Sequence, residues 1–314
     1  MRIVFFGTPE MAVPSLAALA ERHEVAALVC QPDRPSGRGK SLTPPPAKVW
    51  ALDHNIPVAQ PAKLNDGSFE AWLREQRPEI CALTAYGRIL KQPILDVAPH
   101  GILNMHPSLL PLYRGPSPIQ SALINGETET GVTIMRLTLD MDAGDILIQE
   151  RVAIDPEENG ETLTNRLATL GGQKLREAVG QIAAGKAQFT AQDHSRATYC
   201  PLIEKRDGQI DWTTSARGIH NLVRGAQPWP AAQTSLDGQV FKILHTRIAQ
   251  ESSKSVDVEP GTISEVLKDR LIVQTGAGAL AILHLQAPGK RAMPVADFLR
   301  GFVMHAGQRF ENFT

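Results

Sequence analysis

Short continuous apolar runs alternate with helical segments through the first half of the chain. The runs are RIVFF (2–6), VAALVC (25–30), EICALTA (79–85) and GILNMH (101–106), and each has the pattern of a strand buried on both faces. Residues 69–76 between them have a helical pattern. Because strands that alternate with helices are joined by crossovers, the pattern predicts a parallel α/β sheet.

Three further segments extend this organisation. GVTIMRLT (131–138) and ILIQERVAI (146–154) are expected to be later strands of the same sheet. Residues 161–184 have apolar side chains at helical spacing, which predicts one long amphipathic helix. After the first strand, Thr8-Pro9-Glu10 is expected to open a helix with Thr8 as its cap and Pro9 at its first position.

The sequence changes character near residue 190. A polar, irregular stretch is followed by QVFKILHTRIA, GTISEVL, RLIVQT and ALAILHLQA, short strand-like runs separated by Gly and Asp turns. This spacing predicts a small β-barrel or sandwich. We therefore expect a first domain at 1–189, a linker at 190–207 and a second domain at 208–314.

Charge and cysteine content exclude several classes of protein. The formal net charge of the 314 residues is −1, so binding of nucleic acid by bulk positive charge is excluded, although a local basic patch is not. Residues 205–314 carry a net charge of +3, which suits either a solvated surface or a nucleic-acid face. The three cysteines lie far apart, which predicts a reduced cytoplasmic protein without structural zinc or disulfides. No run of 18 apolar residues predicts a membrane span.

The segment 104–115, NMHPSLLPLYRG, contains polar side chains where a predicted buried strand ends. Asn104 and His106 are two residues apart, so they share one face of the strand, while Met105 points to the other. A buried polar pair is costly unless its hydrogen bonds are satisfied. The pair can be a structural hydrogen-bonded pair or part of a catalytic site.

The segment 139–145, LDMDAGD, places three carboxylates in a turn between two predicted strands. It can be a solvated acidic turn, a weak metal site, or the source of a carboxylate that orients His106. The spacing is not that of an EF-hand loop.

A third candidate is the loop QPDRPSGRGK at 31–40. Its three cations lie among prolines and glycines directly after a strand, which favours contacts with phosphates over an ordinary polar loop. Neither G-x-G-x-x-G nor a P-loop occurs in the chain, so the usual nucleotide-binding fingerprints are missing.

These segments together resemble the methionyl-tRNA formyltransferase family over nearly the whole chain. The resemblance rests on FFGTPE, QPDRPSGRGK, AYGRIL, NMHPSLLPLYRGPSPIQ, ETGVTIM, LDMDAGDIL, GQIDW and PWP (228–230). It implies a Rossmann-like, doubly wound, mostly parallel sheet in a catalytic domain, followed by a C-terminal OB-like β-barrel that binds tRNA. The loop at 31–40 distinguishes the tRNA enzymes from related formyltransferases.

The resemblance also implies roles for individual residues. Asn104 and His106 would hold the formyl oxygen, and Asp142 would pair with His106 and assist proton transfer. The co-substrate 10-formyltetrahydrofolate would contact Arg88, Ile89, Leu90, Ser108, Leu109, Leu110 and Pro111. Initiator methionyl-tRNA would meet Arg34, Arg38 and Lys40. No metal is implied, and we expect a cytoplasmic monomer.

The sequence departs from the family at a few positions, and other functions stay open. Arg88 and Lys91 replace an apolar residue and a proline, and Pro107 replaces a glycine, which leaves the pterin contacts open. One alternative is a formyltransferase acting on an amino-sugar nucleotide, which the 31–40 loop disfavours. Another is a non-catalytic RNA-binding protein, which the polar pair disfavours. An α/β oxidoreductase is disfavoured by the missing dinucleotide fingerprint.

Overall fold

The computed structural model describes residues 1–36, 41–250 and 258–313. Contacts divide the chain into two compact units that interleave along the sequence. The first comprises Met1–Pro118, Glu129–Ala153 and Thr164–Pro201, and the second comprises Ile119–Thr128, Ile154–Leu163 and Leu202–Thr314. The domain division at residues 189 and 207 stays a prediction.

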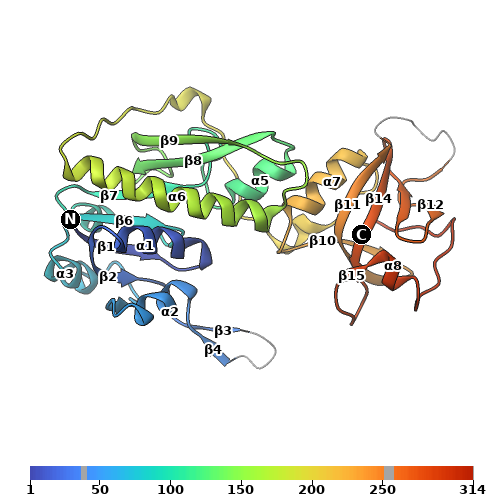
Figure 1. The fold of residues 1–314 in the computed structure, drawn as a ribbon, viewed down its shortest axis with the longest axis horizontal. Coiled ribbons are helices and arrows are strands. Elements are labelled where there is room, and N and C mark those ends of the chain that lie inside the picture. The colour runs from blue at the N-terminus through green and yellow to red at the C-terminus, as the bar shows by residue number, and fades with distance from the viewer. Residues whose placement is uncertain (37–40, 251–257, 314) are drawn as a thin grey trace. The chain divides into compact units, whose positions relative to one another are not determined.

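The first unit is built on a seven-stranded sheet in the order β5-β2-β1-β6-β7-β8-β9 (Figure 1). Strand β8 runs antiparallel to both of its neighbours, and the other recorded pairs are parallel. This confirms the expected mostly parallel sheet. The strands are β1 (Arg2–Gly7), β2 (Glu24–Val29), β5 (Val58–Ala59), β6 (Ile80–Thr84), β7 (Ile102–His106), β8 (Glu129–Arg136) and β9 (Ile146–Ala153).

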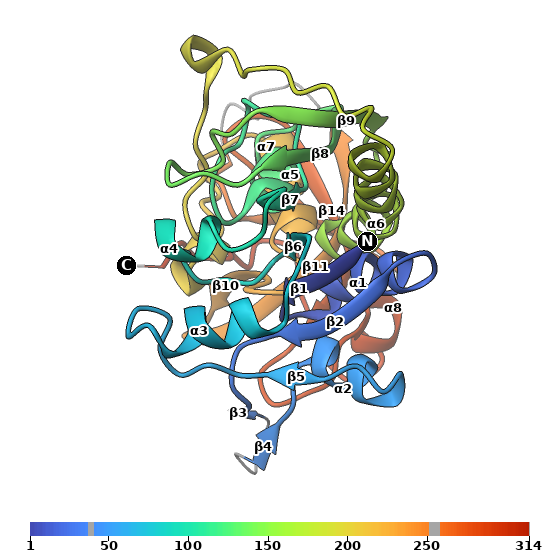
Figure 2. The ribbon, with the colours of Figure 1, turned by 90° about the vertical axis from the view of Figure 1, so that its left-hand side faces the viewer.

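Helices cover both faces of this sheet, which is why its central strands are apolar throughout. Helices α1 (Val13–Ala20) and α6 (Gly160–Ala183) lie on one side, and α3 (Ser68–Glu75) and α4 (Gln92–Leu95) on the other (Figure 2). Phe6 of β1 packs edge-on against Phe69 of α3, with ring centroids 6.1 Å apart. The smaller elements are the 3₁₀ turn Glu10–Ala12, β3 (Arg34–Ser36), β4 (Ser41–Thr43) and α2 (Pro46–Asp53).

The predicted helix cap at Thr8 is wrong. The chain forms a 3₁₀ turn before α1, and the residue that precedes this turn is Pro9, with no side-chain cap. The Thr8 hydroxyl instead donates to the carbonyl of Tyr86 at 3.3 Å and accepts from the backbone N–H of Gln31 at 3.2 Å. Thr8 therefore ties together three loops at the carboxyl ends of β1, β2 and β6, a use that local sequence could not reveal.

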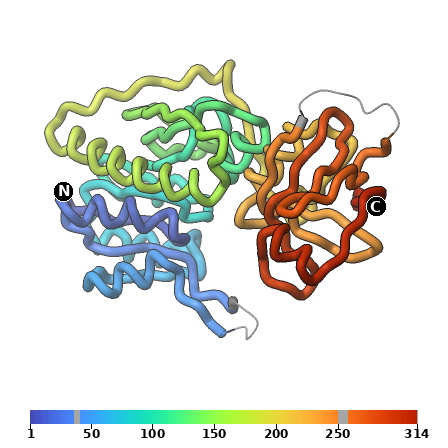
Figure 3. The backbone as a smooth tube through the Cα atoms, turned by 45° about the vertical axis from the view of Figure 1, so that its right-hand side comes forward, coloured from blue at the N-terminus to red at the C-terminus, as the bar shows by residue number. Residues whose placement is uncertain are grey.

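The second unit contains an antiparallel sheet in the order β10-β11-β14-β13-β12, with β15 beside β14. This confirms the predicted small β domain. Figure 3 traces the backbone of this part of the chain in orange to red. Trp212 and Phe310 stack at 5.7 Å in its core, and Phe241 packs against Phe310 at 6.1 Å. The elements are α7 (Ala216–Gly225), β10 (Ala232–Leu236), β11 (Gln239–Gln250), β12 (Ile263–Val266), β13 (Leu271–Gln274), β14 (Ala279–Gln286), β15 (Met293–Pro294) and α8 (Val295–Phe298). Helix α5 (Pro118–Ile124) lies almost wholly in the second unit.

The polar stretch after α6 is anchored to the first unit up to Pro201. Thr190 exchanges backbone hydrogen bonds of 2.8 Å with Ile146, at the start of β9. Two 3₁₀ turns, His194–Arg196 and Lys205–Gly208, follow. Among the described residues, no helix is both long and apolar enough to cross a bilayer.

Candidate functional site

Strand β7 ends with the polar pair that the sequence singled out. Asn104 and His106 are buried, 6% and 4% exposed, between β6 and β8. Met105 faces the other side of the sheet, where a Cβ on Gly171 of α6 would lie 2.7 Å from its Sδ. The alternation expected from strand geometry therefore holds, and the two polar side chains share a face.

Asp142 meets both side chains from the loop between β8 and β9. Its Oδ1 lies 3.5 Å from the Asn104 Nδ2, and its Oδ2 lies 3.7 Å from the His106 Nδ1. Asp140 and Asp145 of the same loop are exposed. Among the described residues, no group of three or more His, Cys, Asp or Glu side chains is arranged to hold a metal ion.

The segment Tyr113–Gly115 fixes the orientation of His106 and Asp142. The His106 Nε2 lies 2.9 Å from the Tyr113 carbonyl oxygen. Because a carbonyl oxygen only accepts, Nε2 carries the proton and Nδ1 faces Asp142. The Gly115 N–H donates to the Asp142 Oδ2 at 2.8 Å. One turn of the chain thus positions both side chains.

Gln192 is a site residue that the sequence did not indicate. Its amide Nε2 donates to the carbonyls of Asp142 at 2.8 Å and Gly144 at 2.7 Å. Its Oε1 accepts from the buried Arg114 guanidinium at 2.7 Å. Asp142 has a left-handed backbone, with φ of 49°, which such hydrogen bonds help to hold. A glutamine in a polar stretch has no local signature, so only its long-range contacts reveal this role.

The predicted co-substrate residues of the 108–111 segment form a braced loop beside the site. The Ser108 hydroxyl donates to the Leu112 carbonyl at 2.7 Å, and the Leu110 N–H donates to the Thr133 hydroxyl at 3.2 Å. Gln149 donates to the Leu110 carbonyl at 2.9 Å. Leu109 contacts the β8 backbone near Gly131, and Pro111 is half-buried. The loop is therefore braced both by its own hydrogen bonds and by contacts with β8 and β9.

The side chains of the segment Arg88–Leu90 lie in three different environments. The Ile89 side chain is 83% exposed, whereas Leu90 is buried in the core, so only its backbone is available to a ligand. The Arg88 guanidinium donates to the carbonyls of Pro61 at 2.7 Å and Ala62 at 3.0 Å. Arg88 thereby braces a neighbouring loop with its side chain.

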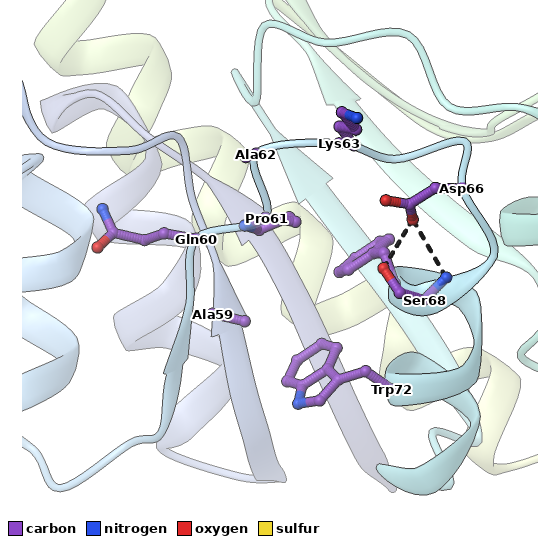
Figure 4. A pocket seen from close by; sticks show the side chains of 9 residues that line it. Ala59, Gln60, Pro61, Ala62, Lys63, Asp66, Ser68 and Trp72 are labelled. Atoms are coloured by element: carbon purple, nitrogen blue, oxygen red, sulfur yellow. Dashed lines mark hydrogen bonds between the residues drawn. The ribbon is translucent and has the colours of Figure 1, made fainter.

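That loop lines an open pocket of about 520 Å³ (Figure 4). Trp72 and Phe69 form its apolar wall, with stacked rings 5.6 Å apart. Ser68 donates to Asp66 at its rim. The pocket does not include Asn104, His106 or Asp142, so the catalytic candidates lie outside it. Its lining residues are Ala59, Gln60, Pro61, Ala62, Lys63, Asp66, Ser68, Phe69 and Trp72.

Comparisons with known proteins agree with this geometry. Residues 1–179 match the formyl transferase family and residues 202–303 match the formyl transferase C-terminal domain. The methionyl-tRNA formyltransferase of Geobacter sulfurreducens is 43% identical over 98% of this chain and 96% of its own. That of Acetivibrio thermocellus is 44% identical over 98% and 99%. The chain belongs to the methionyl-tRNA formyltransferase family.

Solved structures of other proteins share the fold of this chain. WlaRD, a sugar 3N-formyl transferase, superposes with a TM-score of 0.65 at 20% identity, covering 93% of this chain and 99% of that one. HypX from Aquifex aeolicus, solved with tetrahydrofolic acid, gives 0.65 at 19% identity over 95% of this chain and 47% of its own. At these identities the likeness concerns the fold alone.

The loop at 31–40, which the sequence singled out, is described only in part. Arg34 is exposed and donates to the Gln31 side chain, and Asp33 accepts from Lys48 at 2.8 Å. Hydrogen bonds to Lys48 and then Gln60 lower the pKa of Asp33. Arg38 and Lys40 lie outside the described residues. The base of the loop is thus anchored by Asp33, Lys48 and Gln60.

Proposed function

We propose that this protein transfers the formyl group of 10-formyltetrahydrofolate to the α-amino group of methionyl-tRNA, giving N-formylmethionyl-tRNA for translation initiation. The carrying observation is the full-length identity to relatives of that name, together with the convergence of Asn104, His106 and Asp142. The reaction belongs to the cytoplasm, where translation starts, and we propose that the protein acts as a monomer.

The proposed mechanism is acyl transfer through an oxyanion. The neutral amine attacks the formyl carbon, a new C–N bond forms, and negative charge develops on the formyl oxygen. The bond from the formyl carbon to the folate nitrogen then breaks, and that nitrogen takes a proton while the amine loses one. Donors fixed in advance around the oxygen lower the barrier most.

Each of the three side chains has a proposed part in this step. Asn104 donates a hydrogen bond to the oxyanion without titrating. His106 donates a second hydrogen bond to the same oxygen from its imidazole ring. Because Nε2 is used by Tyr113, Nδ1 is the His106 atom that faces the reaction. Asp142 assists removal of the proton from the attacking amine.

The binding residues are proposals of the same kind. The pterin would lie along the backbone at Arg88, Ile89 and Leu90, where an exposed isoleucine offers apolar surface. The braced loop Ser108, Leu109, Leu110 and Pro111 would line the folate. Arg34, Arg38 and Lys40 would contact phosphates of the tRNA acceptor stem.

The test is an assay with 10-formyltetrahydrofolate and two acceptors, methionyl-tRNA and an amino-sugar nucleotide. We expect formyl-methionine on the tRNA and no formylated sugar. A formylated sugar without a tRNA product would contradict the proposed acceptor while keeping the chemistry. Absence of both products would contradict the proposed reaction.

A further inference from the structure

A second pocket, of about 350 Å³, lies within the second unit. Its walls are the segment 156–159, helix α7, and strands β11 and β14. None of these residues is used in the proposed transfer of the formyl group. The lining residues are Pro156, Glu157, Asn159, His220, Val223, Arg224, Gln227, Leu244, His245, Thr246 and His284.

One arginine and three histidines line this pocket. Arg224 is partly buried, its Nε donates to Asn221 at 3.0 Å, and burial lowers the pKa of its guanidinium. Arginine nevertheless stays charged in proteins. The charged and titratable groups that line the pocket are Glu157, His220, Arg224, His245 and His284. The charges of Arg217 and Glu158 act on Arg224, and Arg247 pairs with Glu157.

Glu157 is the acidic side chain that lines the pocket. It lies 3.6 Å from the His245 Nε2 and 3.7 Å from the Arg247 guanidinium, so its charge is already shared by two partners. Its side chain is 59% exposed and can move aside into water. Arg247 can keep the Glu157 carboxylate at the edge of the pocket. An incoming anion would then contact Arg224 and the imidazoles.

The histidines are not arranged as metal ligands. The rings of His245 and His284 are 5.9 Å apart between centroids, and among the described residues no His, Cys, Asp or Glu cluster can hold a metal ion. Two neighbouring arginines would also repel a cation. A permanent cation surrounded by imidazole donors suits an oxyanion, because arginine and protonated histidine both donate charge-assisted hydrogen bonds.

We propose that this pocket binds a phosphate group, held by Arg224 with hydrogen bonds from His220, His245 and His284. The phosphate can come from an RNA backbone or from a small phosphorylated molecule, since the chemistry recognised is the same. The site consists of residues of the second unit alone, so its test does not depend on the proposed transfer of the formyl group.

Phosphate binding should change the titration of His220. Its Nδ1 lies 3.0 Å from the Thr246 hydroxyl, and burial, followed by the charge of Arg224, lowers the pKa of this imidazole. A bound phosphate supplies negative charge that favours the protonated ring. The pKa of the His220 imidazole should accordingly be higher in the phosphate-bound protein than in the free protein.

The experiment is a titration of the full chain with inorganic phosphate at constant ionic strength, followed by the NMR signals of labelled histidine rings. We expect saturable shifts of the His220, His245 and His284 signals, and a higher pKa of the His220 imidazole in the bound protein. Arg224→Gln should weaken binding by about tenfold or more, because a charge-assisted hydrogen bond is lost. Chloride at the same ionic strength should give no saturable shift.

Two further variants keep the result interpretable. His284→Gln changes an exposed side chain and should weaken phosphate by about two- to tenfold without affecting folding. Arg270→Gln removes an arginine paired with Asp269 outside the pocket and should leave binding unchanged. The proposal is wrong if native protein shows no saturable shift, or if His284→Gln binds phosphate as native protein does.

Competition identifies the source of the phosphate. Displacement of inorganic phosphate by tRNA, lost in His284→Gln, would support the site as a contact to an RNA backbone. Displacement by a nucleoside monophosphate with no effect of tRNA would support a site for a small phosphorylated molecule.

Discussion

At the scale of single residues, Asn104 and Asp142 are the side chains whose loss should separate chemistry from binding. Asn104→Ala and Asp142→Ala should each lower turnover by about 10²–10³-fold, because the first removes a fixed donor to the oxyanion and the second removes the group that assists proton transfer. Affinity for tRNA should barely change. Single-turnover formyl transfer and a tRNA-binding assay measure the two effects.

A matched control lies in the same loop. Asp140 is exposed, so Asp140→Ala should keep native turnover. Near-native turnover in Asn104→Ala or Asp142→Ala would remove that residue from the proposed catalytic set.

Two cysteines provide a second prediction at this scale. Burial raises the pKa of the Cys30 thiol to about 11 and that of Cys81 to about 12, above the ordinary value of 9.0. Because the thiolate is the reactive form, neither should react with iodoacetamide at pH 8 in native protein. Both should react once denaturant unfolds the chain and restores the ordinary pKa. Rapid labelling of native Cys30 or Cys81, read by mass spectrometry, would contradict their placement in the core.

At the scale of elements, the segment after α6 supports, through Gln192, the loop that carries Asp142. Gln192→Ala removes three hydrogen-bonded partners and leaves Arg114 buried with fewer acceptors. We expect kcat to fall by up to about 10²-fold as Asp142 loses its position, with KM for tRNA unchanged. Steady-state kinetics separate the two constants.

The exposed Gln173 of α6 is the matched control, and Gln173→Ala should have native kinetics. A Gln192→Ala enzyme with native kcat would show that Asp142 is held well enough by Gly115.

Helix α6 offers a paired test of packing. A Cβ on Gly172 would lie 2.6 Å from the Pro14 carbonyl oxygen of α1, whereas a Cβ on Gly180 has no atom within 4 Å. Gly172→Ala should lower the free energy of unfolding by about 1–3 kcal/mol through overpacking. Gly180→Ala should raise it by about 0.5–1 kcal/mol through helix propensity. Urea unfolding measures both, and equal effects would contradict the close contact of α6 with α1.

At the scale of the whole molecule, the formal net charge of −1 limits how tRNA can be bound. Few phosphates can be neutralised, so the log–log dependence of tRNA affinity on salt should be shallow but not zero. Arg38→Ala should reduce the slope by about one. Filter binding of tRNA at salt concentrations from about 50 to about 200 mM measures this slope.

Arg74→Ala is the control for this experiment, because Arg74 pairs with Glu70 on α3. An Arg38→Ala slope equal to that of the native chain would argue against a phosphate contact in the 31–40 loop.

Local patterns in the sequence were sufficient to predict the buried strands and the polar pair at the end of β7. Continuous apolar runs predict buried strands because both faces of the sheet are covered, and β1, β2, β6 and β7 form where those runs occur. Side chains two residues apart lie on the same face of a strand, which placed Asn104 and His106 together. These properties depend on residues close together in the chain, so periodicity reveals them.

Contacts between distant segments were not accessible in this way. The Thr8 hydroxyl serves Tyr86 and Gln31 rather than a helix end, and Gln192 reaches Asp142 across 50 residues. The pocket around Arg224 combines the segment 156–159 with α7, β11 and β14. Such hydrogen bonds depend on how the chain closes its loops around the core, and a linear pattern of residue types carries no record of which distant polar groups then meet.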